Sequence, residues 1–206
     1  MADLTEPSKS RVGGILLAAG TSSRLGRAKQ LLNFHGKPLV RQVAERALAS
    51  RLESLHVVVG HQASEVRAAL AGLHLEIIDN PGFQSGQSTS LRVGLLSFPR
   101  SLKAAMILLV DQPFVDTQLV DQLIGLYEES GALIVAPEFH GRRGNPVIFD
   151  QQLLPEMLTI VGDTGARDVI ARHRDRLITL ALSSEQPFLD VDTWEDYQKL
   201  TCETEK

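Results

Sequence analysis

The sequence has 206 residues, which at roughly 150 residues per domain favours one large domain with ample chain for a core. Hydrophobic residues make up 43% and charged residues 22%, so disordered and collagen-like classes are excluded. The formal net charge of −4 gives no overall attraction to a phosphate backbone, so we expect no nucleic-acid partner.

The chain has a single cysteine, Cys202, so an intrachain disulfide and a cysteine-based zinc site are excluded. The lack of disulfides is typical of cytoplasmic proteins. The longest apolar run, residues 15–19, falls far short of the roughly 20 residues that a membrane helix needs. Residues 1–11 are polar and do not resemble a secretion signal. We therefore expect a cytoplasmic protein without a membrane segment, with residues 1–11 as a flexible leader and residues 12–206 as a single domain.

Short runs of Leu or β-branched residues alternate along the chain with longer amphipathic stretches. Strands are predicted at residues 12–18, 55–60, 75–78, 104–110, 132–136, 146–149 and 177–181. Helices are predicted at about residues 38–51, 62–72, 87–97, 116–130, 151–159, 164–174 and 193–201. This alternation predicts an α/β fold, with a mainly parallel central sheet and helices on both faces.

Two features refine this prediction. The nearly continuous apolar runs at residues 55–60 and 104–110 are typical of central strands covered on both faces. The glycines and prolines of residues 137–149 predict a hairpin-like insertion, a kind of segment that often covers a substrate.

The segment that follows the first strand, residues 18–32, combines small residues with Arg24, Arg27 and Lys29. A small-residue loop at the carboxyl end of a parallel strand lets backbone N–H groups approach a phosphate, and the basic side chains supply charge. The loop matches neither the P-loop nor the G-x-G-x-x-G pattern. The segment predicts an anion-binding loop, and a turn with solvated cations is the alternative.

Asp111 follows the apolar strand 104–110 directly. The carboxyl end of a central parallel strand faces the crevice in which α/β folds bind ligands, and a carboxylate there suits Mg²⁺ that carries nucleotide phosphates. The alternative is a helix cap, for which Asp116 and Thr117 are better placed.

Asp190 and Asp192 form a second acidic candidate near the end of the chain. In an extended segment, side chains two residues apart lie on one face, so either carboxylate is a candidate second metal ligand. Thr193 followed by Asp196 also matches a helix start, so capping of the last helix by Asp192 and Thr193 is the alternative.

Three further loops have the composition of binding segments. Residues 86–92 (GQSTSLR) open a helix with hydroxyls, residues 141–146 (GRRGNP) present two guanidinium groups in a turn, and residues 162–167 (GDTGAR) lead into a helix. Helix capping by Ser85 or Ser88, a solvated turn and a capped helix start are the respective alternatives. No His-x-x-x-His pair and no G-x-S-x-G motif occurs, which disfavours zinc and serine hydrolases.

Taken together, these motifs resemble the signature of the MobA-like nucleotidyltransferases, and most closely that of molybdenum cofactor cytidylyltransferases. The resemblance spans residues 12–197. Its motifs lie at residues 17–32, 36–39, 109–113 and 190–193, and it narrows to the cytidylyltransferases at residues 86–95, 141–147 and 162–167.

The resemblance implies a Rossmann-like nucleotidyltransferase fold of the GT-A type. It also implies Mg²⁺-dependent transfer of CMP from CTP to the phosphate of molybdopterin, with release of pyrophosphate. A recipient molybdoenzyme or its chaperone is the further partner that it suggests. Two alternatives remain. The protein is a guanylyl- or cytidylyltransferase that acts on another phosphorylated small molecule, or it is a noncatalytic carrier of molybdenum cofactor.

The resemblance also assigns roles to individual positions. Those implied to bind nucleotide are Ala18, Ala19, Gly20, Ser22, Arg24, Lys29 and Ser90. Arg24, Lys29 and Asp111 are implied to be catalytic, Asp111 with Asp192 or Asp190 to hold the metal, and Arg143, Asn145 and Arg167 to bind the pterin substrate. The choice of CTP depends on Ala19, where guanylyltransferases usually have glycine. A methyl group there narrows the pocket, although one such difference is worth only about 1–3 kcal/mol.

Overall fold

The computed structural model describes residues 10–162 and 166–202. Within these ranges the central sheet has eight strands. Seven follow one another in the spatial order β10-β7-β9-β6-β1-β4-β5, and β8 pairs with β7. The strands are β1 (Val12–Ala18), β4 (Leu55–Val59), β5 (Glu76–Asp79), β6 (Ala104–Leu109), β7 (Ile134–Phe139), β8 (Arg142–Arg143), β9 (Val147–Asp150) and β10 (Leu177–Ala181).

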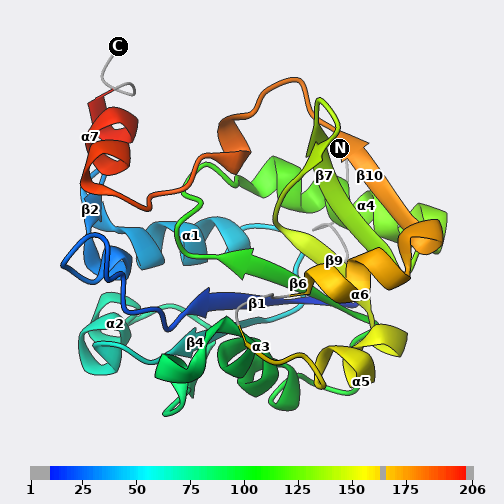
Figure 1. The fold of residues 1–206 in the computed structure, drawn as a ribbon, viewed down its shortest axis with the longest axis horizontal. Coiled ribbons are helices and arrows are strands. Elements are labelled where there is room, and N and C mark those ends of the chain that lie inside the picture. The colour runs from blue at the N-terminus through cyan, green and yellow to red at the C-terminus, as the bar shows by residue number, and fades with distance from the viewer. Residues whose placement is uncertain (1–9, 163–165, 203–206) are drawn as a thin grey trace, which may run out of the picture.

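Helices connect the strands and cover both faces of the sheet (Figure 1). The α-helices are α1 (Leu39–Leu48), α2 (Ala63–Ala69), α3 (Gln87–Leu96), α4 (Thr117–Ser130), α5 (Leu154–Met157), α6 (Arg167–Arg172) and α7 (Trp194–Cys202). Short 3-10 helices are η1 (Lys29–Leu31), η2 (Phe83–Ser85), η3 (Gln151–Leu153), η4 (Arg174–Arg176) and η5 (Gln186–Phe188). A separate two-stranded sheet joins β2 (Asn33–Phe34) to β3 (Lys37–Pro38).

The predicted α/β architecture is confirmed, and the sheet is mostly parallel. β1 runs parallel to both β4 and β6, β4 runs parallel to β5, and β7 runs parallel to β10. β9 is antiparallel to β6 and β7 because the chain turns back through β8 without a crossover helix. The carboxyl ends of β1, β4, β5 and β6 therefore meet at one edge of the sheet, where loops and helix starts gather.

Two apolar clusters fill the space between the sheet and its helices. One packs Val43 of α1, Val66 of α2 and Leu123 of α4 against one face. The other packs Leu91 of α3, Met157 of α5 and Val169 of α6 against the opposite face. All five residues of β4 and all seven of β1 are buried, as expected for strands covered on both sides.

Several predicted boundaries differ from the observed ones for local reasons. The stretch predicted as one helix at 151–159 is a 3-10 turn followed by the four-residue helix α5, with Pro155 in its first turn. The strand predicted at 132–136 extends to Phe139 because it pairs with β8 in a hairpin, which confirms the predicted insertion. The start of the helix predicted at 164–174 falls among residues 163–165, which lie outside the described residues.

The two ends of the described chain are both attached to the fold. Residues 1–9 of the expected leader lie outside the described residues, whereas Ser10 is buried and donates its hydroxyl to the Arg51 carbonyl at 2.9 Å. At the other end, Leu200 of α7 packs with Phe34 of β2 and with Val191 in a third cluster. Figure 1 shows α7 and β2 at the same end of the molecule. No helix of the described residues has the length and apolar character needed to cross a bilayer.

Candidate active site

The loop that follows β1 is organised by a residue that the sequence motifs leave unassigned, Gln30. Its fully buried side chain donates to the carbonyl oxygens of Ala18 and Gly20, each at 2.9 Å. The hydroxyl of Ser22 accepts from the Lys29 backbone N–H at 3.0 Å, which closes the loop. The loop is therefore fixed at both ends, with Gly20 exposed at the carboxyl edge of the sheet.

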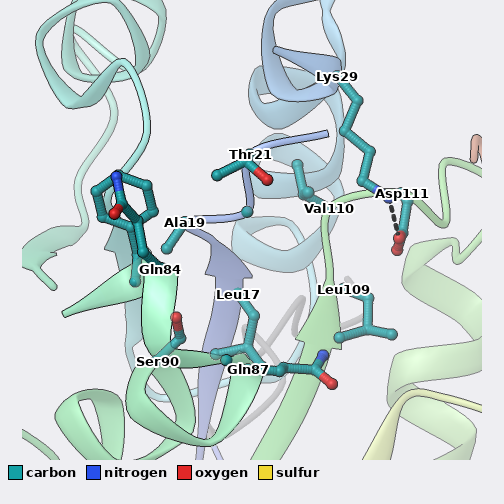
Figure 2. A pocket seen from close by; sticks show the side chains of 13 residues that line it. Leu17, Ala19, Thr21, Lys29, Gln84, Gln87, Ser90, Leu109, Val110 and Asp111 are labelled. Atoms are coloured by element: carbon teal, nitrogen blue, oxygen red, sulfur yellow. Dashed lines mark hydrogen bonds and ion pairs between the residues drawn. The ribbon is translucent and has the colours of Figure 1, made fainter. Parts of the chain in front are cut away.

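The centre of the site is a cluster of one ammonium and two carboxylates. Lys29 Nζ lies 2.6 Å from Asp111 Oδ2 and 3.0 Å from Asp192 Oδ1. The side chains of Lys29 and Asp111 are only 15% and 19% exposed, compared with 40% for Asp192. Figure 2 shows Lys29 extending across the edge of the sheet to Asp111. Three residues far apart in the sequence thus form one partly buried charge cluster.

The backbone explains why the cluster forms. Asp111 follows the end of β6, and its carbonyl oxygen accepts from the Val191 N–H at 2.9 Å, which ties the acidic segment to that strand end. The start of α7 is capped by Thr193 and Asp196, each of which accepts from the other's backbone N–H. Thr193 and Asp196 accept hydrogen bonds from the backbone N–H groups at the start of α7. The Asp192 side chain is therefore not needed as a cap, and it contacts Lys29.

The electrostatics of the cluster favour the charged ammonium. Burial alone lowers the pKa of Lys29, but the Asp111 and Asp192 carboxylates outweigh it, so the pKa lies above its usual value. Partial burial raises the pKa of Asp190; the hydrogen bond from Gln112, at 2.8 Å, opposes this, and the neighbouring carboxylates reinforce it. Lys29 therefore acts as a fixed positive charge beside Asp111 and Asp192.

The two acidic candidates and Arg24 differ in their contacts. Asp192 contacts Lys29 through one oxygen and Arg24 through the other, at 3.5 Å, whereas Asp190 accepts from Gln112. The Arg24 side chain is 74% exposed, so its ion pair is the weaker of the two. The structure thus brings Asp192 together with Asp111 through a shared ammonium, and it gives Asp190 a separate partner.

A cavity of about 390 Å³ opens beside the cluster. Its wall includes Ala19, Gly20, Thr21, Lys29, Phe83, Gln84, Gln87, Ser90 and Asp111. Its size is within the range usual for ligand pockets of roughly 300–1,000 Å³. Figure 2 shows Ser90 and Gln87 on the side formed by α3, across from Lys29 and Asp111.

Ser90 is buried in this wall and accepts from Asn80 Nδ2 at 2.9 Å. The same amide donates to Thr89 at 2.9 Å, so Asn80 fixes two hydroxyls in the first half of α3. The predicted capping of this helix by Ser85 or Ser88 is not observed, because Gly86 with φ of +106° occupies the N-cap and no side chain caps it. The first turn of α3 is thus held by the hydrogen bonds from Asn80 to Thr89 and Ser90.

A second cavity of about 170 Å³ adjoins the first and shares Leu17, Gln87 and Leu109 with it. Asn145 and Arg167 line this second cavity, together with apolar residues of β9 and α6. Arg143, the third residue predicted to bind substrate, is exposed on β8 and lines neither cavity. The structure therefore brings Asn145 and Arg167 together and leaves Arg143 outside.

The acidic pair has the chemistry of a divalent-cation site. Asp111 Oδ1 is buried without a hydrogen-bond partner, and Asp192 has two further carboxylate oxygens, which contact Lys29 and Arg24. Mg²⁺ is commonly held by one or two carboxylates together with substrate phosphates, so this donor set fits it. Within the described residues, no group of three or more His, Cys, Asp or Glu side chains is arranged to bind a metal. A metal held here would need ligands from the substrate.

Sequence reasoning gave no individual role to Gln30, Gln87 and Gln112, although each lies within one of the motifs, and it missed Asn80 altogether. Asn80 follows β5 as Asp111 follows β6, so the rule that polar residues at strand ends face the crevice identifies it. Gln30 stands beside Lys29 in the loop motif, but a glutamine in a loop gives no sign that it is fully buried. Gln87 and Gln112 acquire their importance from contacts across the fold, which no local pattern encodes.

Comparison with known proteins gives a consistent result. The model of the MobA-like NTP transferase domain family matches residues 14–177. The nicotine blue oxidoreductase of Paenarthrobacter nicotinovorans is 32% identical over 197 residues, which cover 92% of this chain and 96% of that protein. The molybdenum cofactor guanylyltransferase of Xanthomonas euvesicatoria pv. vesicatoria is 26% identical over 205 residues, which cover 92% of this chain and 94% of that protein.

Solved structures give the same fold. The crystal structure of a homologue of Mycobacterium tuberculosis Rv0371c, from Mycobacterium sp. strain JC1, aligns with a TM-score of 0.84 at 30% identity and covers 95% of this chain and 97% of that one. Rv0371c from M. tuberculosis H37Rv, solved in complex with manganese, aligns with a TM-score of 0.75 at 27% identity and covers 92% of this chain and 97% of that one.

Proposed function

Because this chain belongs to the MobA-like NTP transferase family, we propose that it transfers CMP from CTP to the phosphate of molybdopterin and releases pyrophosphate. The observation that carries the proposal is the Lys29–Asp111–Asp192 cluster, which lies at a cavity with a second, smaller cavity beside it. The proposal includes the cytoplasm as its compartment and a recipient molybdoenzyme or its chaperone as the partner that takes the product.

The nucleotide in this proposal occupies the larger cavity. Gly20 and the loop fixed by Gln30 present backbone N–H groups to the phosphates, with Ala18, Ala19 and Ser22 shaping the loop. Arg24 and Lys29 neutralise the triphosphate, and Ser90 lines the part of the wall formed by α3. The molybdopterin phosphate enters from the second cavity, past Asn145 and Arg167.

Asp111 and Asp192 are the residues that would hold Mg²⁺, with Asp190 as the neighbouring alternative. The metal supplies positive charge against the oxygens of the triphosphate. The manganese complex of Rv0371c supports a divalent metal in a relative of this chain. The unpartnered Oδ1 of Asp111 supports its role as the main ligand.

In the reaction, an oxygen of the molybdopterin phosphate attacks the α-phosphorus of CTP. A new P–O bond forms there, and the bond between the α-phosphorus and the bridging oxygen breaks, so that pyrophosphate leaves with the electron pair. No protein nucleophile or base is required because the attacking phosphate is already ionised. Lys29 and Arg24 stabilise the charge on the leaving phosphates, and the two cavities align the reactants.

The choice of CTP over GTP depends on the wall near Ala19. Its methyl group is buried, and the wall is tightly packed, since a Cβ on the neighbouring Gly60 would lie 3.0 Å from Ala19 Cβ and 2.7 Å from Phe83 Cβ. Because this part of the cavity wall is tightly packed, it favours cytosine, which is smaller than guanine. The expected discrimination is about 1–3 kcal/mol, or roughly 5- to 150-fold.

The test is to incubate the protein with Mg²⁺, molybdopterin and each of CTP, GTP, ATP and UTP, and to measure pyrophosphate and the mass of the product. The proposal predicts release with CTP and a product one CMP unit heavier than molybdopterin. Release of pyrophosphate with GTP in place of CTP would contradict the proposed preference for cytosine, but the protein would still be a nucleotidyltransferase. No release with any nucleotide would contradict transfer to this acceptor, and binding of the cofactor without turnover would favour a carrier.

A further inference from the structure

The junction of the two cavities contains one polar side chain among the described residues, that of Gln87. Leu17, Gln87 and Leu109 are the described residues that line both cavities. Leu17 and Leu109 are register partners on the neighbouring strands β1 and β6, so they form an apolar floor. Gln87, the first residue of α3, projects beside this floor, as Figure 2 shows.

The charged groups lie on either side of this junction. Lys29 and Asp111 line only the first cavity, and Arg167 lines only the second. If the donor triphosphate and the acceptor phosphate occupy these cavities, as the proposed function requires, the phosphorus that changes partners lies where the cavities meet. The side chain best placed to contact it from α3 is then a neutral carboxamide.

We infer that Gln87 contacts both substrates and stabilises the phosphoryl group during its transfer. This inference depends on the proposed function and adds a catalytic residue to it. A carboxamide carries two N–H donors, so one side chain can donate to an oxygen of the α-phosphate and to an oxygen of the attacking phosphate. As the acceptor P–O bond forms and the bond to pyrophosphate breaks, negative charge gathers on the oxygens of the α-phosphate, so the hydrogen bond from Gln87 to that phosphate is stronger in the transition state than in the ground state.

The chemistry of the step suits an amide. A second carboxylate at the junction would repel two phosphates that must approach each other, and a further cation would bind the ground state as strongly as the transition state. The reaction needs no proton removed, so a neutral donor completes the positioning that Lys29 and Arg167 begin from either side.

The position of Gln87 also makes it a clean target for substitution. Its side chain is exposed, and it follows the N-cap Gly86 in the first turn of α3, outside both apolar clusters that cover the sheet. Replacement therefore removes no core packing, and the thermal midpoint of each variant, measured beside that of the wild type, separates a loss of stability from a loss of catalysis.

The experiment compares steady-state kinetics of Gln87→Met, Gln87→Glu and two control variants, with CTP or GTP, molybdopterin and Mg²⁺. Gln87→Met keeps the length of the side chain and removes both donors, and we expect kcat to fall on the order of 10²-fold. Gln87→Glu adds a negative charge, and we expect a larger fall. Thr21→Val alters only the first cavity and Ile170→Val only the second, so each control should change the KM of one substrate.

A kcat of Gln87→Met within about twofold of the wild type would overturn the inference, as would a rise in the KM of one substrate alone at unchanged kcat. Both results presuppose an active wild-type protein, so they leave the proposed function standing. A wild-type protein that releases no pyrophosphate with either nucleotide would contradict the proposed function and the inference together.

Discussion

The two cavities at the carboxyl edge of the sheet differ in how their polar groups are held. In the larger one, Lys29 is bound by two carboxylates and Ser90 by Asn80, so the side chains are already in place. In the smaller one, no hydrogen bond or ion pair within the described residues holds the side chains of Asn145 and Arg167. The charged side of the site is therefore preorganised, and the side chains of the acceptor side remain available for contacts that a substrate would supply.

The largest expected effect comes from removing the carboxylate in the cluster. Asp111→Asn keeps the side-chain size but removes the negative charge that Lys29 and the metal require, so we expect turnover to fall on the order of 10³-fold. Pyrophosphate release measures it. Asp79→Asn is the matched control, since Asp79 ends the parallel strand β5 but pairs with Arg67 at the surface. Equal activities of the two variants would contradict the assignment of Asp111.

The next effect separates the two functions of Lys29. Lys29→Met removes a charge from the proposed triphosphate site, and we expect turnover to fall roughly 10²-fold, less than for Asp111→Asn. The same change leaves Asp111 and Asp192 without the ammonium between them, so Mn²⁺ should bind more tightly than in the wild type when no nucleotide is present. Electron paramagnetic resonance of Mn²⁺ measures this. Weaker Mn²⁺ binding would show that the carboxylates do not bind metal together.

A third prediction concerns the contact between the hairpin and the acidic segment. A Cβ on Gly144 would lie 2.3 Å from the ring of Phe188, in the stretch that leads to Asp190 and Asp192. Gly144→Ala should therefore lower the free energy of unfolding by about 1–3 kcal/mol. Gly125→Ala, at a helical site with open space, should raise it by about 0.5–1 kcal/mol. Urea denaturation distinguishes the two, and equal stabilities would refute the packing argument.

The smallest effects test the acceptor side. Arg167 lines the second cavity and Arg143 does not. Arg167→Met should raise the KM for molybdopterin roughly tenfold, as expected for loss of one charged hydrogen bond worth about 1.5–3 kcal/mol. Arg143→Met should change it less than about twofold. If Arg143→Met had the larger effect, the acceptor would bind at the hairpin and not in the second cavity.

The sequence anticipated the charged side better than the acceptor side. Asp111 follows a strongly apolar strand, and a small-residue loop follows another, so the rule for parallel strand ends identifies both. The same reasoning left Asp192 undecided between metal binding and helix capping. In the structure, Thr193 caps the helix together with Asp196, and Asp192 contacts Lys29. The Val191–Asp111 backbone hydrogen bond, which joins distant segments, holds Asp192 near Asp111.

The acceptor side depends on long-range geometry that no local pattern encodes. Two arginines in a turn predicted a joint role for Arg142 and Arg143, but pairing with β7 leaves both exposed and directs Arg142 toward Phe188. The predicted hairpin-like insertion is consistent with the antiparallel direction of β9, but no local pattern shows that β9 pairs with β6 as well as with β7. Gln87 became a candidate only when α3 was seen to pack on β1 and β4, with Gln87 lining both cavities.

The most direct test of the account is a crystal structure of the protein with Mn²⁺ and a non-hydrolysable CTP analogue, with the metal located by its anomalous scattering. The account predicts a peak bound by Asp111 and Asp192, with Lys29 moved from the carboxylates onto the phosphates and the α-phosphate next to Gln87. A metal peak on other residues, or a nucleotide bound with Lys29 still between the two carboxylates, would contradict it.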